Sequence, residues 1–507
     1  MNKSVSLKKV SISFNEKLVL DEVSFRCSVP ERVCVVGENG GGKSTLLKLI
    51  AKIHTPDKGN IDISAGMRTY YVAQEFSHED FTKTVEKFIR DNSHVSVFNK
   101  VITHATILGL PILRLLKEEC GILSGGQQKI LSLSVALANS PDFLLLDEPE
   151  NHLDIVSRKK LIELLCNYKN SIVFISHDKN IIDVLAEAVV EIADGKLYVS
   201  EGGYDEYIMN RQNRIGGIQR RFDSEEKRVK QLAKALIVLG KKAFRGKDVA
   251  MYNNRKAELE KIKKDHKETP RAKDEFTKIR LRETGSRLHV GKVLVKVENL
   301  TFTFTPNAQH LFSRLTFELR VGSHMILLGR NGSGKSTFLK LLEEKLQPLE
   351  GSIQWAHGVR VNYFDQHMNF DHSKTPLTVT EDHFSCPTEK ARQILGAMKF
   401  IPEKMERRIG NLSGGEKMRL KFAITFGMDP DVVVLDEPTN HLDITTWETL
   451  LENCNKTSAT IILVTHDEEF IDLIENKKFF VISKSHIQEK HKNLDELIEE
   501  METGNIG

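Results

Sequence analysis

Two glycine-rich segments carry the residue pattern of a phosphate-binding loop. Each reads Gly, four residues, then Gly-Lys-Ser-Thr, and each follows an apolar run, VCVVG or MILLG. In such a loop backbone N–H groups converge on phosphate oxygens, the lysine reaches the β- and γ-phosphates and the serine holds Mg²⁺. Two copies make a chance match negligible. The candidate residues are Gly37, Asn39, Gly40, Gly42, Lys43, Ser44 and Thr45 in the first copy, and Gly329, Asn331, Gly332, Gly334, Lys335, Ser336 and Thr337 in the second.

Two apolar segments, FLLLDE and VVVLDE, end in paired carboxylates. In an open α/β sheet a ligand lies at the carboxyl ends of the strands, so these acids would face it. Asp147 and Asp436 are suited to the coordination of a metal ion, and Glu148 and Glu437 to polarising an attacking water. The alternative is that these acids only cap the next helix, which the upstream glycine loops disfavour.

Further polar residues recur at fixed distances from these motifs. His177 and His466 each lie 29 residues after the second acid, which favours a γ-phosphate sensor over a structural histidine. Gln74 and Gln366 follow their lysines at equal spacing, which strengthens a signal that is weak in either alone.

The segments LSGGQ and LSGGE provide a serine, two glycines and a helix N-terminus, which suit a second phosphate-contacting surface. Such a surface is redundant in a domain that already holds a glycine loop. It makes sense if it serves the nucleotide held by the other copy. The candidate residues are Ser124, Gly126, Ser413 and Gly415.

All these motifs occur twice in the same order, so the chain is a tandem duplication. Lysines and glutamines are separated from their counterparts by 292 residues, and the later serines, glutamates and histidines by 289. Apolar strands alternate with helices, which predicts α/β domains with largely parallel, buried sheets. We place the copies at 1–210 and 293–490, a linker at 211–292 and a short acidic tail at 491–507.

This order of motifs resembles the ATP-binding cassette. The resemblance implies that two cassettes close head to tail on two ATP molecules with Mg²⁺, to which the glutamines contribute. Site one would combine Lys43, Ser44, Gln74, Asp147, Glu148 and His177 with Ser413 and Gly415. Site two would combine Lys335, Ser336, Gln366, Asp436, Glu437 and His466 with Ser124 and Gly126. Both sites keep their catalytic residues, so we expect both to hydrolyse ATP.

Two further features bear on these sites. Phe14 and Phe304 precede the glycine loops at equivalent places and resemble the family's adenine-stacking aromatics, although phenylalanines of a strand core are the alternative. Glu150 stands where the second copy has Thr439, beside the expected cassette interface. This difference would make the two sites unequal.

The linker is the one strongly basic part of the chain. Residues 211–290 carry 24 Lys and Arg against 11 Asp and Glu, a balance of +13, whereas the remaining residues carry −10. Such asymmetry indicates contact with nucleic acid or an anionic membrane. We expect two helices, from about Tyr204 to Leu239 and from about Val249 to Glu283, each about 50 Å long. Gly240 and Gly246 would mark the turn of this hairpin.

The segment around the expected turn mixes apolar and cationic residues. Two helices that pack at their ends would explain the apolar ones. The alternative is a tip whose apolar groups contact bases while its cations meet phosphates. The candidate RNA contacts are Lys234, Leu236, Leu239, Lys241, Lys242, Phe244, Arg245 and Lys247.

Tandem cassettes, a basic helical linker and NHLD after both pairs of acids resemble the ABC-F family, ribosome-associated ATPases rather than transporters. The resemblance implies that the ATP-loaded protein binds the tRNA exit site. Its linker would reach the P-site tRNA and large-subunit rRNA near the peptidyl-transferase region. The expected partner is therefore the ribosome, without membrane subunits, and the expected protein is a monomer whose own cassettes pair.

Spacing guides the choice within this family. Gln74 and Ser124 are 50 residues apart, which leaves no room for an inserted helical arm, and residues 491–507 are short and acidic. This resembles the antibiotic-resistance members, which displace ribosome-bound drugs by target protection. A housekeeping translation factor acting on P-site tRNA is the alternative, and the ATPase subunit of an ABC transporter is a second.

The composition fits a globular cytoplasmic protein. Hydrophobic residues make up 40% and charged residues 28%, which excludes a disordered or fibrous chain. No apolar run approaches the roughly 18 residues of a membrane span, and the first residues lack a signal peptide. The six cysteines form no CxxC pair, so we expect reduced structural thiols rather than a disulfide framework, a zinc site or the cluster of the iron–sulfur ribosome-recycling ATPase.

Overall fold

The structure of the chain is a computed structural model. It describes residues 3–14, 17–243, 249–268, 289, 291–305, 310–322, 324–364, 370–398, 400–412, 414–440, 442, 444–482 and 486–503. The chain divides into two compact units, one of Met1–Val199 with Lys278–Gly507 and the other of Ser200–Thr277.

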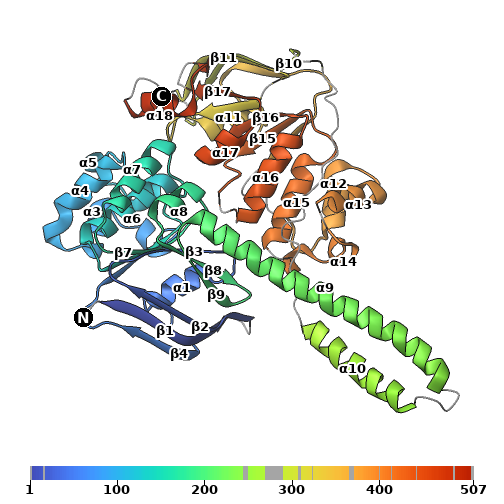
Figure 1. Cartoon of the computed structure of the whole chain (residues 1–507). Coiled ribbons are helices and arrows are strands. Elements are labelled where there is room, and N and C mark those ends of the chain that lie inside the picture. Colours follow the sequence, from blue (N-terminus) through green and yellow to red (C-terminus); the bar gives the residue numbers. More distant parts are fainter. Residues whose placement is uncertain are drawn as a thin grey trace. The chain divides into compact units, whose positions relative to one another are not determined.

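The first unit contains the same six-stranded sheet twice (Figure 1). The strand order is β5-β6-β7-β3-β8-β9 in the first copy and β14-β15-β16-β12-β17-β18 in the second. The first sheet is formed by β3 (Arg32–Gly37), β5 (Thr69–Val72), β6 (Phe143–Asp147), β7 (Ser171–Ile175), β8 (Ala188–Ala193) and β9 (Lys196–Glu201). The second is formed by β12 (His324–Leu328), β14 (Val361–Phe364), β15 (Val432–Asp436), β16 (Thr460–Val464), β17 (Lys477–Ile482) and β18 (Ile487–Lys490).

The first five strands in each order pair in parallel, and their sequences show why. Every residue of β6 and of β7 is buried, the continuous apolar run expected of strands covered on both faces. The predicted fold class, two tandem cassettes of α/β type, is confirmed.

A three-stranded antiparallel sheet accompanies each parallel sheet. The first contains β1 (Ser4–Phe14), β2 (Lys17–Ser28) and β4 (Lys58–Ile63), and the second β10 (Val293–Phe302), β11 (Phe312–Arg320) and β13 (Glu350–Trp355). Strand β11 largely alternates buried and exposed residues, as expected when one face of a sheet packs on a core.

Helices connect the strands in both copies, with differences in the short elements that precede α6 and α15. The first copy has α1 (Lys43–Ile50), α2 (His78–Phe81), α3 (Val85–Asn92), η1 (Val95–Val97), α4 (Phe98–Ile107), α5 (Ile112–Leu115), η2 (Cys120–Ile122), α6 (Gly125–Asn139), α7 (Ile155–Cys166) and α8 (Lys179–Leu185). The second has α11 (Lys335–Leu342), α12 (Pro376–Phe384), α13 (Thr388–Ala397), α14 (Pro402–Met405), η3 (Ile409–Asn411), α15 (Gly414–Phe426), α16 (Ile444–Lys456), α17 (Glu468–Leu473) and α18 (Leu494–Glu502).

The two copies share a buried core at their contact. Ile155 and Val156 of α7 belong to the same hydrophobic cluster as Leu494 and Leu497 of α18. Helix α18, in the predicted acidic tail, therefore packs on the first copy instead of standing free.

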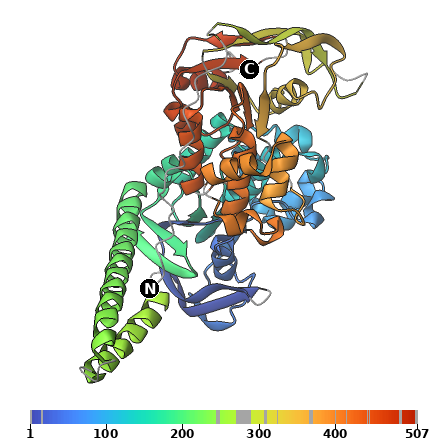
Figure 2. The same ribbon diagram turned by 90° about the vertical axis from the view of Figure 1, so that its right-hand side faces the viewer.

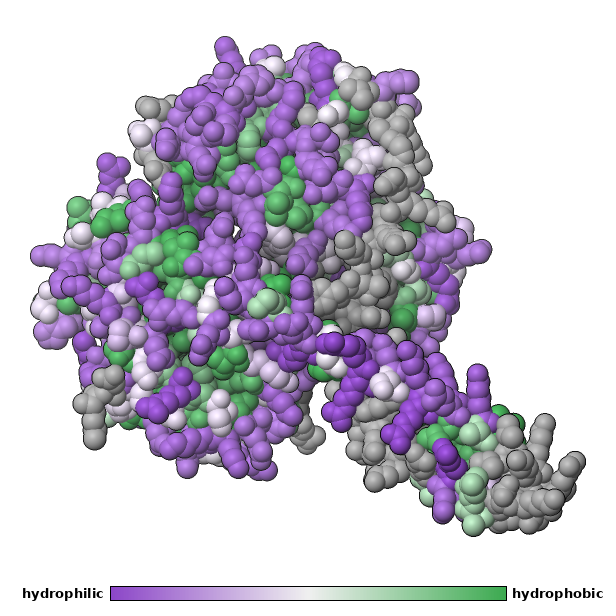
Figure 3. All heavy atoms as spheres, viewed as in Figure 1, coloured by the Kyte–Doolittle hydropathy of each residue, from purple (hydrophilic) through white to green (hydrophobic). Residues whose placement is uncertain are grey.

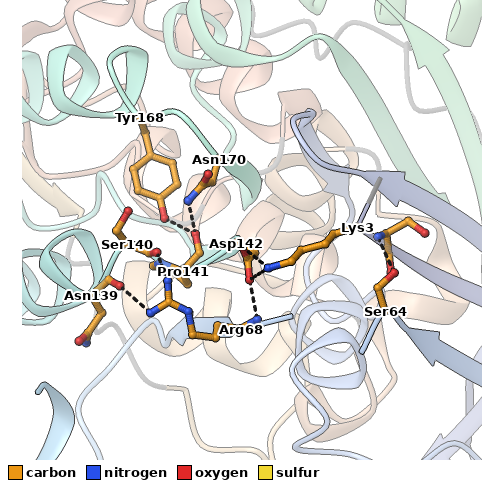
Figure 4. A network of polar contacts seen from close by, with 10 residues as sticks. Lys3, Ser64, Arg68, Asn139, Ser140, Pro141, Asp142, Tyr168 and Asn170 are labelled. Carbon is orange, nitrogen blue, oxygen red and sulfur yellow. Dashed lines mark hydrogen bonds and ion pairs between the residues drawn. The ribbon is translucent and has the colours of Figure 1, made fainter. Parts of the chain in front are cut away.

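A polar network ties the strand starts of the first copy together (Figure 4). Asp142, just before β6, accepts hydrogen bonds from Lys3 Nζ at 2.8 Å and from the Arg68 backbone N–H at 2.9 Å. The bond from Lys3 is the main cause that lowers the pKa of Asp142. In the second copy Asp431 accepts the same backbone bond from Arg360 at 2.9 Å, so the duplication extends to this detail.

The second unit is a helical hairpin of α9 (Tyr204–Ala243) and α10 (Val249–Glu268), which lie side by side (Figures 1 and 2). Helix α9 has 40 residues, a length of about 60 Å at 1.5 Å per residue. Leu232 and Leu259 are both buried, and each lies a similar number of residues from the turn along the sequence. This is expected of residues that face each other across the hairpin.

The two predicted linker helices are confirmed, but the predicted turn is partly wrong. Helix α9 continues through Gly240 to Ala243, so this glycine does not end it. An interior helical glycine costs only about 1 kcal/mol, and α9 is a 40-residue helix in contact with α10. The second marker, Gly246, and the expected end of the second helix at Glu283 lie outside the described residues.

The surface and the thiols agree with the composition. Hydrophilic side chains predominate on the face of the cassettes in view (Figure 3). Within the described ranges, no helix is long and apolar enough to cross a membrane. All six cysteines are free thiols, four of them buried and two, Cys166 and Cys386, half-buried.

Candidate functional site

Both glycine loops are folded around their lysines. Lys335 Nζ donates to the carbonyl oxygens of Gly329 at 2.7 Å and of Arg330 at 3.3 Å, and Lys43 Nζ donates to Gly37 O at 2.8 Å. Gly334, which precedes α11, has a φ of +99°, and a Cβ atom there would lie 2.6 Å from Phe312 Cζ. Only glycine fits both this conformation and this space.

The paired acids lie where strands β6 and β15 end. Ser336 Oγ lies 3.1 Å from Asp436 Oδ1, which brings a hydroxyl and a carboxylate of two motifs together. Glu148 and Glu437 both have a φ of +45°, an unusual value for a residue with a side chain. Such conformations cluster at functional sites, where the surrounding structure maintains them.

In the first copy one predicted residue, Gln74, and two that were not predicted lie around the acids. Gln74 Nε2 donates to Glu148 Oε2 at 2.9 Å, and Asn151 Nδ2 donates to the same oxygen. Tyr71 Oη donates to Asp147 Oδ2 at 2.9 Å. The equivalent Gln366 lies outside the described residues.

A cavity of about 360 Å³ lies between the two copies and is lined by both of them. The sequence-predicted residues in its lining are Ser124, Gly126, Glu148 and His177 from the first copy, and Asn331, Gly332, Gly334, Lys335, Ser336, Thr337, Glu437 and His466 from the second. The structure thus brings most of site two together across the interface.

Site one is described less completely. Lys43, Ser44 and Gln74 are not in the described lining of this cavity, and Ser413, the serine expected to complete site one, lies outside the described residues. Gly415 lies near the start of α15, with open space where a Cβ atom would stand.

The LSGGQ segment begins helix α6. Ser124 is its N-cap and accepts a bond from the Gln127 N–H at 3.3 Å. A Cβ atom at Gly126 would lie 2.4 Å from His152 O and 3.1 Å from Asn331 Nδ2. The backbone of His152, in the same cassette, therefore requires glycine at this position, which the loop of the second copy also approaches.

The NHLD segment of the first copy contacts the glycine loop of the second. Asn331 Nδ2 donates to His152 O at 3.1 Å, and the Asn331 N–H donates to Asp154 Oδ2 at 3.3 Å. Asn331 was predicted to bind nucleotide, whereas its contact with the other cassette was not predicted. The repetition of NHLD in both copies was the sequence feature that could have indicated this contact.

Burial shapes the electrostatics of site two. It raises the pKa of Glu437, while the nearby Lys335 opposes the shift. It also lowers the pKa of His466 well below the usual range, and the positive charges of Lys335 and Arg158 add to this effect. His466 Nε2 lies 3.4 Å from Glu437 Oε1. The histidine is thus neutral at physiological pH and its ring keeps one donor and one acceptor.

Two cations in the first copy, the buried Lys129 and the largely buried Arg158, were not foreseen. Lys129 Nζ donates to Asp147 O at 2.8 Å and to Ala73 O at 3.1 Å, and burial lowers its pKa to about 8. Arg158 reaches the second copy by donating to His466 O at 2.9 Å. At the same 289-residue offset the second copy has Met418 and Trp447, so comparing the copies position by position could have singled out both.

The candidate aromatics are exposed. Phe14 and Phe304 are 41% and 69% exposed, which contradicts the alternative that they belong to a strand core. Phe14 contacts His54 edge-on, with 5.4 Å between the ring centroids.

The candidate RNA contacts are only partly described. Lys234 is exposed and Leu236 half-buried on α9. Helix α9 also contains Leu239, Lys241 and Lys242, but their side chains are outside the described set, as is the whole segment with Phe244, Arg245 and Lys247.

Comparison with known proteins identifies the family. The family model described as "ABC transporter" matches residues 20–151 and 312–440. ATP-binding protein Uup of Buchnera aphidicola subsp. Acyrthosiphon pisum is 30% identical over 98% of this chain and 83% of its own length. ABC transporter F family member 5 of Arabidopsis thaliana is 30% identical over 94% of this chain and 75% of its own length. The chain belongs to the ABC-F family.

This ABC-F protein is therefore an ATP-binding protein and an ATP hydrolase. The archaeal ribosome recycling factor aABCE1, solved in complex with the ribosomal stalk protein aP1, has a similar fold. It matches with a TM-score of 0.62 and 20% identity over 97% of this chain and 92% of its own. This likeness supports the tandem-cassette fold.

Proposed function

We propose that this ABC-F ATPase acts on the ribosome and protects it from antibiotics. Its linker would reach toward the peptidyl-transferase centre and dislodge the bound drug. The observation that carries the proposal is the helical hairpin between the cassettes, within a segment whose charge balance is +13. Such a surface suits the phosphates of large-subunit rRNA and P-site tRNA. If the chain were the ATPase subunit of a transporter, a basic helical hairpin would have no function.

The proposed working unit is one chain in the cytoplasm, without membrane subunits. Its two cassettes, assigned to 1–210 and 293–490, pair with each other, and residues 211–292 form the linker and 491–507 the tail. ATP closes the cassettes, closure sets the angle of the hairpin, and hydrolysis reopens them and releases the ribosome.

The site residues take the following roles in this cycle. Glu148 and Glu437 polarise the attacking waters, and His177 and His466 contact the γ-phosphates. Lys335 and its loop bind the phosphates of one ATP, and Ser124 and Gly126 approach that ATP from the other cassette. The equivalent residues of site one are Lys43 with its loop, Ser413 and Gly415. Phe14 and Phe304 stack on the adenines.

The residues around the acids fit Mg²⁺. Ser336 Oγ and Asp436 Oδ1, 3.1 Å apart, form the oxygen pair that this ion prefers. Ser336, Asp436 and Gln366 would hold it in site two, and Ser44, Asp147 and Gln74 in site one. When bound, the ion neutralises phosphate charge.

The protection of drug-bound ribosomes rests on the chain's own features, because the relatives named above carry no drug in their names. Between β5 and α6 the first cassette has only short helices, the longest being α4 with 10 residues, which leaves no inserted arm. The alternative is a housekeeping translation factor that acts on P-site tRNA.

The first experiment is ribosome cosedimentation of the Glu148→Gln, Glu437→Gln double variant with and without ATP. Loss of both water-polarising groups traps the closed state, so we expect ATP-dependent comigration with ribosomes and no ATP turnover. The matched control is Glu119→Gln, Glu403→Gln, which changes two exposed glutamates and keeps turnover. Tight ATP binding without comigration would contradict the ribosomal function and favour a transporter ATPase.

The second experiment separates protection from a housekeeping role. Cells expressing the unaltered chain are tested for growth on lincosamides, pleuromutilins, streptogramins, macrolides, phenicols and oxazolidinones. We expect at least a fourfold rise in the inhibitory concentration for one class, abolished by the double variant. Unchanged susceptibility to all of them, with intact ribosome binding, would favour the translation factor.

A further inference from the structure

Arg158 of α7 connects the histidine loops of the two cassettes. Its side chain is only 11% exposed and forms an ion pair with Asp178, the residue after His177. The same guanidinium donates from its second terminal nitrogen to the backbone carbonyl of His466 at 2.9 Å. Asp178 is also the N-cap of α8. One side chain of the first cassette thus holds both its own histidine loop and that of the second.

The residue equivalent to Arg158 in the described part of the second cassette cannot make the reverse connection. The position 289 residues after Arg158 is Trp447, whose Nε1 donates to Asp467 Oδ2 at 2.6 Å. Asp467 is the N-cap of α17, so this bond corresponds to the ion pair of Arg158 with Asp178. An indole has one N–H, and Asp467 already uses it, whereas a guanidinium has five donors. Trp447 cannot hold two loops at once.

The residues near Arg158 and those near Trp447 also differ in charge. Glu150, which is buried, accepts a bond from Ser176 Oγ at 2.5 Å, and it lies in the electrostatic field of Arg158. In the second cassette the corresponding contact joins the hydroxyls of Thr439 and Thr465 at 2.8 Å. A buried ion pair adds little stability over an apolar pair of similar size, so stability alone does not explain the charged set.

The loop that Arg158 reaches in the opposite cassette belongs to site two. His466 lies 3.4 Å from Glu437, and the charge of Arg158 acts on both groups. We propose that Arg158 is a positioning residue for site two, acting from the opposite cassette, and that Trp447, at the equivalent position, does not do the same for site one. ATP hydrolysis in site two therefore depends strongly on Arg158, which bonds to His466 itself. Hydrolysis in site one depends on it less, because there the ion pair is with Asp178, beside the histidine. This inference rests on the site assignments of the proposed function.

The test is a site-specific measurement of hydrolysis in the full chain. ATP carrying a photoreactive azido group on its adenine is trapped with vanadate after hydrolysis and crosslinked, and the chain is then cleaved in the linker. The labelled half identifies the site, since the second cassette holds the nucleotide of site two. In Arg158→Met we expect trapping in the second cassette to fall at least tenfold and trapping in the first to fall less than threefold.

Three further variants keep the result interpretable. Lys159→Met removes the neighbouring exposed charge and should leave both halves labelled as in the unaltered chain. Arg158→Lys keeps the charge but loses the two terminal nitrogens that contact Asp178 and His466 at once. It should therefore restore only part of the labelling. Trp447→Phe removes the indole donor and should leave labelling of the first cassette unchanged. ATP affinity before hydrolysis and the unfolding temperature of Arg158→Met should stay near those of the unaltered chain.

Equal loss of labelling in both halves would overturn the inference, because Arg158 would then support closure in general. Unchanged labelling in both halves would overturn it as well. If the unaltered chain trapped no nucleotide in either half, the assignment of the two sites would fail, and the role of Arg158 would fail with it.

Discussion

At the scale of single residues, Gly334 offers the most direct test of the candidate site. Replacement by alanine would force a side chain into a φ of +99° and place its Cβ 2.6 Å from the Phe312 ring. We expect Gly334→Ala to lower the free energy of unfolding of the second cassette by about 1–3 kcal/mol and to weaken its ATP binding.

The matched control is Gly396→Ala in α13, where a Cβ atom would meet nothing within 4 Å. Gly396 lies in the last turn of α13, where alanine should stabilise by at most about 1 kcal/mol. Thermal unfolding and ATP titration of both variants check the pair. Equal unfolding temperatures would show that the glycine loop tolerates a side chain.

The sequence alone predicted the residues whose chemistry repeats at fixed spacing, such as Lys335, Glu437 and His466, and the structure brings these three to one cavity. It could not predict Arg158, because an arginine on a helix after a motif is indistinguishable from a surface charge until its partners in both cassettes are known. The positive φ of Glu437 was equally invisible, since it arises where the strand ends.

At the scale of secondary-structure elements, helix α9 contains a Gly216–Gly217 pair with open space where either Cβ atom would stand. Alanine at each position should therefore favour the helix by about 0.5–1 kcal/mol. We expect Gly216→Ala, Gly217→Ala to slow amide hydrogen exchange in this part of α9 by about two- to fivefold per substitution.

The control for this pair is Gly358→Ala, which also has open space but a φ of +76°. That substitution should destabilise its turn. If the double alanine variant exchanged faster than the unaltered chain, the pair would be needed for a contact of α9 and would not simply tolerate the helix.

Strand β12 begins at a half-buried histidine that predicts a pH effect. His324 Nδ1 accepts a bond from the Ile461 N–H at 3.1 Å, and burial lowers the pKa of His324 below 6.5. Below pH 6.5 the unfolded chain binds a proton that the folded chain does not. The neutral His324 therefore contributes its full stability above pH 6.5. This contribution is lost as the pH falls toward the pKa of His324 in the folded chain, which is the lower of the two.

We expect the unfolding temperature to fall more between pH 7.5 and pH 5.5 in the unaltered chain than in His324→Gln, whose amide oxygen can accept the same bond. Other histidines titrate equally in both proteins, so the difference isolates His324. Identical pH dependence in the two proteins would contradict the assignment.

At the scale of the whole molecule, the duplication and the charge asymmetry were both readable from the sequence, because equal offsets and local charge do not depend on folding. The cavity lined by both copies was expected only because the order of the motifs resembles that of the ATP-binding cassette. Its actual lining depends on how two cassettes pack, including the approach of Asn331 to Gly126, and no spacing within one cassette encodes that distance.

The basic linker predicts a strong dependence of ribosome binding on salt. Each phosphate that a lysine or arginine neutralises releases counterions, and 6–10 such contacts reduce affinity by about 10³–10⁵ between 50 and 200 mM salt. Because the balance of +13 is concentrated in residues 211–290, most of these contacts should belong to the linker. Ribosome affinity of the Glu148→Gln, Glu437→Gln variant with ATP, measured across this range, gives the slope.

Two triple variants then locate the contacts. Lys227, Lys234 and Lys256 are exposed on the hairpin, and changing them to glutamine should lower the slope by up to about 3, about 1 for each lost phosphate contact. Lys87, Lys117 and Lys169 are exposed on the first cassette, and the same change there should leave the slope unaltered. Both variants remove the same net charge, so only the position of the charge differs between them. Equal slopes would mean that ribosome binding responds to the net charge of the protein and that the hairpin is not its main contact.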